Sequence, residues 1–269
     1  MISFRKNDLT FLQFDNLSQF PAIGHFSTTR AGGCSTDRYA SLNMGYNTGD
    51  RPKNVLSNRQ ILCSALEISF EHLIFPKQTH TGSVKVITAD FFNLDETEKK
   101  QFLNETDAVI TNLKNVCVSI KTADCVPILV YNPVYHSVAA IHAGWRGTTQ
   151  NIVQNTINLM IASFGSNPSD LWVGIGPSIS PEVYEVGEEV WSQFAPELYQ
   201  PTNPFKNDKR LLDLLKANFQ QLIALGVPEN QIEVARICTL SNPELFFSAR
   251  RDGAKTGRMA TGIWLAGGD

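Results

Sequence analysis

The stretch of sequence that decides the fold is VCVSIKTADCVPILVYNPVYHSVAAIHAGWRG, residues 116–147. It holds three apolar runs, rich in valine and isoleucine and separated by turn residues: Val116–Ile120, Pro127–Tyr131 and Val138–Ile141. Runs of this kind are typical of buried strands. A glycine-bearing turn at Gly144–Gly147 then leads into an amphipathic segment from about Thr149 to Phe164. The stretch therefore predicts consecutive strands followed by a helix that covers them.

Similar patterns extend outward from this stretch. Further strands are predicted at Val84–Ile87, Trp172–Ile175 and Ile232–Ile237. Helices are predicted from about Pro52 to Leu66, from Thr149 to Phe164 with Gly165 as the stop, and from Lys209 to Leu225 between the cap Asp208 and the stop Gly226. Their inward faces are expected to include Ile152, Met160, Ile161, Leu211, Leu212, Leu222 and Ile223. Because helices and strands do not alternate regularly, we expect an α+β layered fold rather than a doubly wound sheet.

Two polar stretches, Asn93–Lys100 and Pro196–Asp208, are predicted as surface loops within one domain that spans residues 1–269. The chain is 42% hydrophobic, which is ample for a sizeable core, and its net charge of −3 gives no electrostatic reason to expect nucleic acid as a partner. The apolar runs are too short to cross a bilayer, and the N-terminus lacks the apolar stretch of a secretory signal. We expect a cytoplasmic protein with no membrane partner. Its oligomeric state does not follow from the sequence.

Five cysteines are widely spaced and form no Cys-x-x-Cys pair, which predicts neither a disulfide framework nor a zinc ribbon: Cys34, Cys63, Cys117, Cys125 and Cys238. Three segments instead place a metal-binding side chain beside an apolar run. They are Lys77-Gln78-Thr79-His80, Thr122-Ala123-Asp124-Cys125 and His142-Ala143-Gly144-Trp145-Arg146-Gly147. Two histidines and one cysteine without a fourth protein ligand suit a catalytic zinc ion, whereas closed structural zinc sites use four.

Each segment also has a simpler interpretation. Trp145 can fill the core in an ordinary strand–turn–helix connection, buried free cysteines are mostly inert, and His80 can cap a turn. His25, His72 and His136 are interpreted as structural, and Cys117 as part of the core. Arg30, Arg146 and Arg250 are three candidates for one anion pocket, since a guanidinium can bind phosphate through two parallel hydrogen bonds. Arg146 is favoured because it follows the metal-ligand candidate His142 and opens the predicted helix.

Taken in order, these segments resemble the laccase-domain family, also called multicopper polyphenol oxidases or peptidoglycan editing factors, and described as zinc-dependent purine nucleoside phosphorylases with adenosine deaminase side activity. The resemblance covers nearly the whole chain. It includes Phe26–Arg30, Ser41–Asn43, Gly49-Asp50, Thr106–Ala108, Gly174–Pro177 and Ser248–Gly253 besides the three segments above. It implies that His80, Cys125 and His142 are metal ligands, and that the fold is a layered α/β/β/α sandwich.

The resemblance implies an enzyme that takes a nucleoside and phosphate. The expected catalytic residues are His80, Cys125, His142 and Asp124, with Asp124 as a proton shuttle or as a partner that orients the site. The expected substrate- and phosphate-binding residues are Arg30, Asn43, Lys77, Gln78, Arg146 and Arg250. Zinc is expected rather than copper, because a multicopper oxidase needs many histidines and the chain has five. Two alternatives stay open: a metal-free cysteine hydrolase acting on peptidoglycan precursors through Cys125 and a histidine, and a non-enzymatic interaction protein.

Overall fold

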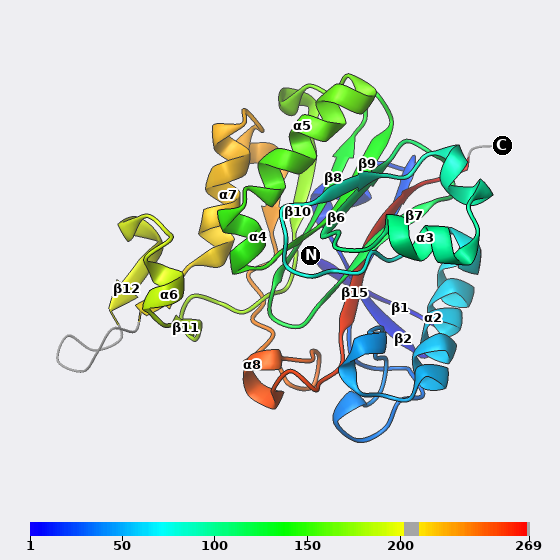
Figure 1. Cartoon of the computed structure of the whole chain (residues 1–269), viewed down its shortest axis with the longest axis horizontal. Coiled ribbons are helices and arrows are strands. Elements are labelled where there is room, and N and C mark those ends of the chain that lie inside the picture. The colour runs from blue at the N-terminus through cyan, green and yellow to red at the C-terminus, as the bar shows by residue number, and fades with distance from the viewer. Residues whose placement is uncertain (202–209, 268–269) are drawn as a thin grey trace.

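The computed structural model of the chain describes residues 1–201 and 210–267. Two six-stranded sheets pack face to face, and helices cover their outer sides (Figure 1). In spatial order the first sheet contains β1 (Ile2–Lys6), β2 (Leu9–Gln13), β3 (Ile23–Thr28), β15 (Met259–Leu265), β7 (Cys117–Thr122) and β4 (Leu73–Ile74). The second contains β14 (Ile232–Val234), β10 (Trp172–Ile175), β8 (Val126–Asn132), β9 (Ser137–Ala143), β6 (Ala108–Thr111) and β5 (Val84–Val86). The predicted layered α/β/β/α fold is confirmed.

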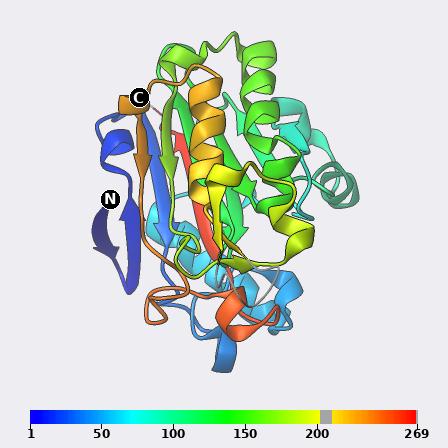
Figure 2. The same cartoon turned by 90° about the vertical axis from the view of Figure 1, so that its left-hand side faces the viewer.

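Helices α5 (Ile152–Phe164) and α7 (Leu214–Ala224) lie on the outer face of the second sheet, and Figure 2 shows them in front of its strands. Helix α2 (Pro52–Leu66) covers the outer face of the first sheet at the opposite side of the molecule. The shorter helices are α1 (Asp15–Ser18), α3 (Glu96–Phe102), α4 (Trp145–Thr149), α6 (Glu188–Trp191) and α8 (Ala249–Asp252). A small third sheet of β11 (Glu185–Val186), β13 (Arg210–Leu212) and β12 (Tyr199–Pro201) projects beside α6.

The apolar core lies in layers that match this architecture. Between the two sheets, Val118 and Ile120 of β7 pack in one cluster with Leu129 of β8 and Ala140 of β9. A second cluster joins the other face of β8 and β9 to α5 and α7, and a third joins the first sheet to α2. Every residue of β8 and β9 is buried. These strands are sandwiched on both faces, which explains why they appear in the sequence as continuous apolar runs.

The strands predicted around residues 116–141 are confirmed, and β10 has the predicted bounds. Consecutive strands need not share a sheet, however. β7 belongs to the first sheet and β8 to the second, while β8 and β9 form an antiparallel hairpin. The short connection Ala123–Cys125 therefore crosses from one layer to the other. This crossing places Cys125 at the edge where the two sheets meet.

Several predicted elements are wrong in their bounds. The helix expected from Thr149 to Phe164 is α5, which begins only at Ile152. The short helix α4 precedes it, and Asn151 separates the two helices with a left-handed φ of 57°. Asparagine tolerates this conformation better than most residues. Gly165 ends α5 as predicted. Ile161, expected on the inward face, is 40% exposed.

The helix expected from Lys209 begins only at Leu214, and Asp213 caps it by accepting a hydrogen bond from the backbone N–H of Lys216. Leu211 and Leu212 belong to β13 instead, and Ile223 is exposed rather than inward-facing. The proposed cap Asp208 and most of the predicted loop Pro196–Asp208 lie outside the described residues. The other predicted loop, Asn93–Lys100, contains the start of α3, where Asp95 and Glu98 form a capping box.

One buried histidine gives the fold a predictable response to acid. His25 of β3 is 2% exposed, and its Nε2 accepts a hydrogen bond of 2.9 Å from the backbone N–H of Phe14. Burial lowers the pKa of His25 from 6.5 to about 4. The folded state then binds fewer protons than the unfolded state below pH 6.5, so stability falls as the pH drops from 6.5 to about 4.

We expect this loss to approach about 3 kcal/mol, from 1.36 kcal/mol for each unit of pKa shift. Urea unfolding of the protein and of His25→Gln at several values of pH between 7.5 and 4.5 measures it. Other titrating groups contribute equally to both proteins. The variant is expected to lose less stability between these limits, and parallel curves would assign the acid sensitivity to other groups.

Candidate metal centre

Three side chains from different parts of the fold converge at the edge between the sheets. His80 lies in the loop between β4 and β5, Cys125 at the crossing from β7 to β8, and His142 within β9. Their ligand atoms all lie within 4.8 Å of one another. The two imidazole rings stand 4.9 Å apart at an interplanar angle of 71°. A shared zinc ion would hold the three atoms within about 4 Å, because zinc bonds are about 2.0–2.3 Å long. Binding it would require at most a small inward movement.

Asp107, which directly precedes β6, organises this set. Its Oδ1 accepts a hydrogen bond of 2.7 Å from Nδ1 of His142, which leaves Nε2 of that ring as the metal-facing atom. The same carboxylate accepts hydrogen bonds from the backbone N–H groups of Thr79, His80 and Thr81 and from the Thr81 hydroxyl. One fully buried side chain thus orients His142 and holds the loop that carries His80. A carboxylate behind a histidine ligand is a common feature of protein zinc sites.

The ionisable side chains of the site shift one another's pKa values. Burial alone would raise the pKa of the Cys125 thiol, but His142 and His80 lower it to about 6. Burial alone would lower the pKa of His142, but Cys125 and Asp107 raise it to about 9. For Asp107, burial opposes ionisation and the hydrogen bond from His142 overcomes it, so that the pKa falls to about 2. The site therefore favours a thiolate, which is the form that binds metals and attacks electrophiles.

Gly144 closes the centre from the side of β9. A Cβ atom at this position would lie 3.0 Å from the Cys125 sulfur and 3.1 Å from Cδ2 of His80. The backbone of Gly144 has a φ of −75° and a ψ of 169°, which any residue can adopt. The need for glycine at this position is therefore steric and comes from the ligands.

Gly144→Ala is accordingly expected to displace Cys125 or His80 and to weaken zinc binding about 10- to 100-fold, the range seen when the orientation of ligands is disturbed. The free energy of unfolding of the metal-free protein should change by less than about 1 kcal/mol, because no backbone strain is introduced. Competition with a zinc chelator and urea unfolding measure the two effects. Unchanged zinc affinity would show that the ligands do not need this space.

The Asp124 carboxylate is held by several hydrogen bonds in this arrangement. Its side chain is buried and accepts hydrogen bonds from the hydroxyls of Thr239 (2.6 Å) and Ser248 (3.0 Å) and from the backbone N–H of Arg250 (2.7 Å). Its backbone carbonyl accepts another from the N–H of Ile179. Asp124 therefore ties the residue next to Cys125 to the segments before β11 and before α8, and its contacts favour an orienting role.

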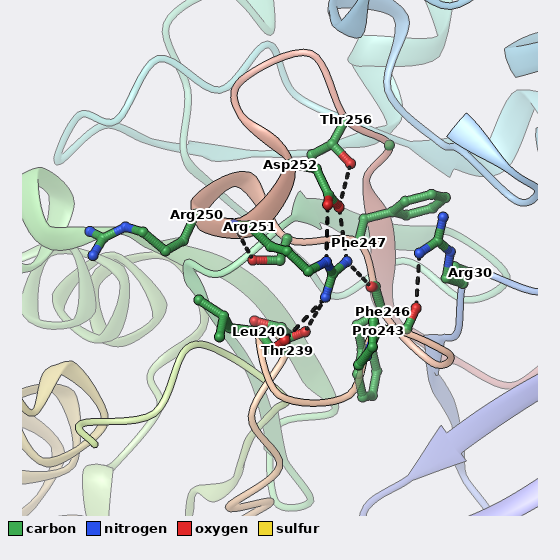
Figure 3. A network of polar contacts seen from close by, with 12 residues as sticks. Arg30, Thr239, Leu240, Pro243, Phe246, Phe247, Arg250, Arg251, Asp252 and Thr256 are labelled. Atoms are coloured by element: carbon green, nitrogen blue, oxygen red, sulfur yellow. Dashed lines mark hydrogen bonds and ion pairs between the residues drawn. The ribbon is translucent and has the colours of Figure 1, made fainter. Parts of the chain in front are cut away.

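Of the three arginines proposed for one anion pocket, Arg30 lies apart from Arg146 and Arg250. Arg30 donates to the carbonyls of Ala40 and Pro243 and lies over the ring of Phe247. Figure 3 shows Arg30 beside a network centred on Arg251, whereas Arg250 points away from that network. The Arg250 guanidinium lies over Tyr184 and donates to the carbonyl of Glu185.

The Arg146 guanidinium lies 4.1 Å from the ring centroid of its neighbour Trp145 and is exposed. Helix α4 is a single short turn, so Arg146 does not open a long helix as the sequence predicted. Tyr184 lies within electrostatic reach of Arg146, Arg250 and Cys125. Burial raises the pKa of Tyr184, and the charge of Cys125 adds to the increase. The two arginines and two aromatic rings thus flank one side of the metal centre.

The remaining sequence candidates mostly support loops. The Asn43 side chain is fully buried and bonds to Gly45, Thr48, Asp50 and the backbone N–H of Arg258. The Gln78 amide bonds to both the N–H and the carbonyl of Lys121. Lys77 is exposed. The sequence reading did not select Asp107 as a site residue. The feature of the sequence that could have indicated Asp107 is its place directly before the apolar strand Ala108–Thr111.

The chain is similar to known proteins over nearly its whole length. The family model described as multi-copper polyphenol oxidoreductase laccase matches residues 24–266. The chain is 41% identical over 269 residues to a purine nucleoside phosphorylase of Bacteroides thetaiotaomicron, covering 98% of this chain and 99% of that protein. It is 35% identical over 257 residues to adenosine deaminase RL5 of an unknown prokaryotic organism, covering 94% and 97% of the two chains.

A solved structure has the same fold. The crystal structure of YlmD from Geobacillus stearothermophilus matches with a TM-score of 0.88 at 32% identity and covers 98% of each chain. Among the described residues, no helix is long and apolar enough to cross a membrane.

Proposed function

The chain belongs to the multi-copper polyphenol oxidoreductase laccase family, and on this basis we propose that it is an enzyme, a purine nucleoside phosphorylase with adenosine deaminase as a second activity. Relatives that match nearly its whole length carry both names. The observation that carries the proposal is the convergence of His80, Cys125 and His142 behind Asp107. A three-ligand set leaves a coordination position open for a substrate atom.

Phosphorolysis transfers the ribosyl group from the base to phosphate. A phosphate oxygen forms a bond to C1′ as the bond from C1′ to the purine nitrogen breaks. The nitrogen keeps the electron pair and takes up a proton, and the products are ribose 1-phosphate and free base. In deamination, water supplies the oxygen that replaces the amino group of adenosine, and ammonia leaves. Neither reaction changes the oxidation state of the substrate.

We propose zinc as the resident metal. The thiolate and two imidazoles suit either zinc or copper(I), and zinc is favoured because neither reaction needs redox chemistry. When bound, zinc would supply a Lewis acid that polarises a substrate atom. Asp107 would keep His142 in the tautomer that presents Nε2. The five free thiols include an exposed Cys34, which suits the reducing cytoplasm as the place of action.

We assign substrate binding to the residues that flank the centre. Trp145 and Tyr184 offer rings against which a purine can pack, each with a guanidinium already over it. Asp124 would hold the polypeptide next to Cys125 and the turn of Arg250 in fixed positions through its hydrogen bonds. Arg146 and Arg250 remain candidates for contacts with the nucleoside.

A paired assay tests the function. Purified protein is analysed for metal and then incubated with inosine plus phosphate, or with adenosine without phosphate. We expect about one zinc per chain, ribose 1-phosphate and hypoxanthine from the first mixture, and inosine from the second. Stripping the metal with a chelator should abolish both activities, and added zinc should restore them. Turnover of neither nucleoside by the zinc-loaded protein would rule the proposal out.

The lowered pKa of Cys125 beside His142 also favours a second candidate, a metal-free cysteine hydrolase. The same metal analysis separates the two. An active protein that contains no metal, and whose activity is lost on alkylation of Cys125, would support the hydrolase.

A further inference from the structure

A second group of cations, Lys121, Arg59 and Arg258, lies near the segments that carry the metal ligands. Lys121 of β7 and Arg59 of α2 both lie against the ring of Phe75, with Nζ and Cζ at 5.0 Å and 4.4 Å from its centroid. Arg258, just before β15, joins them through Met44. The backbone N–H of Met44 donates to the carbonyl of Arg258, and its carbonyl accepts from the Arg59 guanidinium at 2.8 Å.

Sheet register places these cations on one face. Ala260 of β15 is paired with Lys121 of β7, and Arg258 precedes Ala260 by two residues. Side chains two residues apart on an extended strand point to the same face. That face is the one covered by α2, whose Leu62 and Cys63 share a cluster with Ala260. Arg59 reaches the group from this helix.

Among the described residues, none of the three cations forms an ion pair with a carboxylate. All three are half-buried. Burial lowers the pKa of Lys121 well below its usual range. The charges of Arg59 and Arg258 add to the decrease, and the negative charge of Asp107 opposes it without overcoming it. Partly desolvated cations normally need a counter-charge, because desolvation and mutual repulsion both cost free energy.

Their hydrogen-bonding capacity is also partly unused. Lys121 donates to the carbonyl of Pro76, and Arg59 donates through Nε and Nη2 to the single carbonyl of Met44. Arg258 donates to the carbonyls of Thr256, Gly257 and Ala254. Lysine has three N–H donors and arginine has five. In the part of the chain that the structure describes, each cation therefore keeps at least two N–H groups without an acceptor.

The group lies beside the metal ligands. The Gln78 side chain binds both backbone groups of Lys121, and Gln78 is two residues from His80. Lys121 is itself four residues before Cys125. The negative charges of Cys125 and Asp124 act on Arg258. An anion bound here would lie next to a nucleoside held at the metal centre.

We infer that Lys121, Arg59 and Arg258 form the binding site for a phosphate group, an inference that rests on the proposed phosphorylase function for the identity of its ligand. Phosphate carries a double negative charge, which suits three cations that have no ion-pair partner among the described residues, and its oxygens can accept from a guanidinium in parallel pairs. With the nucleoside between Trp145 and Tyr184, the phosphate would approach from the side of α2. The inference replaces Arg30, Arg146 and Arg250 as the candidates for holding phosphate.

The test uses the metal-loaded protein and Lys121→Met, which removes the charge and keeps the apolar stem. We expect the KM for phosphate in inosine phosphorolysis, and the Kd for inorganic phosphate in calorimetry, to rise at least about tenfold, since a charged partner is lost. The KM for inosine should stay within about twofold, as should adenosine deamination without phosphate. Lys121→Arg should restore most of the affinity.

Two controls separate binding from folding. Lys100→Met makes the same chemical change on the exposed surface of α3 and should alter none of these constants. Without phosphate, Lys121→Met should unfold at the same or a higher temperature than the parent protein, because it relieves repulsion from Arg59 and Arg258. The rise in melting temperature produced by phosphate should shrink. A lysine with only a structural role would give the opposite result, a lower melting temperature and an unchanged response to phosphate.

A comparison of the binding of adenosine and AMP shows whether the site takes the free phosphate ion or the phosphate group of a nucleotide. If the site takes the free ion, adenosine and phosphate bind together and AMP binds no more tightly than adenosine. If it takes the 5′-phosphate of a nucleotide, AMP binds at least about tenfold more tightly than adenosine, and Lys121→Met abolishes the difference. Unchanged affinity of Lys121→Met for both phosphate and AMP would overturn the inference while leaving an active phosphorylase intact. Conversely, phosphate binding that depends on Lys121 in a protein without nucleoside turnover would refute the function and preserve the site.

Discussion

In Cys125→Ala, bound zinc is expected to fall to the background level and both nucleoside activities to drop by at least about a thousandfold. The reason is that a metal Lewis acid contributes several kcal/mol to a transition state, and each 1.36 kcal/mol is a factor of ten in rate. The fold should be retained, because Cys125 lies at the edge where the sheets meet and not within the clusters that hold the layers together. Metal analysis, the paired nucleoside assay and circular dichroism measure these outcomes.

Cys34→Ala is the matched control, since it removes an exposed thiol away from the metal ligands. It should keep both zinc and activity. Full activity in Cys125→Ala would eliminate the zinc enzyme and the cysteine hydrolase together. Loss of activity from a protein that never contained metal would leave the hydrolase.

Asp107→Asn is expected to have the largest combined effect on metal binding and stability. The carboxylate is fully buried and its pKa is about 2, so it is ionised at any working pH. Asparagine replaces one acceptor oxygen with an amide NH2 group, a donor that would face the N–H groups of the Thr79–Thr81 loop or the ring of His142. Loss of one member of a buried charged pair costs about 3–5 kcal/mol. Loss of the carboxylate behind a ligand costs about 10- to 100-fold in metal affinity.

Urea unfolding of the metal-free protein and chelator competition measure the two effects separately. Asp90→Asn makes the same change at an exposed position and should alter neither. If Asp107→Asn weakened zinc binding without lowering stability, the carboxylate would act only on His142. A loss of stability without a change in zinc affinity would assign it to the loop alone.

The candidate ligands His80, Cys125 and His142, which the structure brings together, could be selected from sequence because their signals are local. Cys125 directly precedes one apolar run and His142 directly follows another, and the strands that these runs form are buried on both faces. The sheet assignment could not be predicted, because it depends on pairing between segments far apart in the chain. β15 pairs with β3 and β7, which lie more than a hundred residues earlier in the chain. Thr261 and Gly262 interrupt its apolar residues, so the segment does not form an apolar run that would predict a strand.

The errors in the helices have local causes that propensity does not capture. Asn151 has a left-handed backbone and interrupts an otherwise helical pattern between α4 and α5. Leu211 and Leu212 fit an amphipathic helix, but pairing with β11 and β12 draws them into a strand. Tertiary pairing overrode helical periodicity in the second case.

The arrangement of the cations could not be predicted for a further reason. Sequence gives the identity of an arginine but not its acceptors. Arg30 was a candidate anion ligand, and its donors are directed at the carbonyls of Ala40 and Pro243. Lys121 and Arg59 are far apart in the sequence, and they meet over Phe75 only because α2 packs on the sheet that contains β7.

The three candidate ligands differ in how firmly the surrounding structure fixes their positions. This difference decides which of them can be replaced in a redesigned protein. His142 lies in a strand that is buried along its whole length, and Cys125 lies at the crossing between layers. His80 is exposed, and its loop is held through backbone N–H groups that bond to Asp107 whatever the side chain is. The backbone at His80 has a φ of 64°, however, so position 80 can be varied with little disturbance only among residues that tolerate a left-handed conformation. A library at this single residue, screened for uptake of different metals, would be the most economical route to a version of this enzyme with altered metal preference.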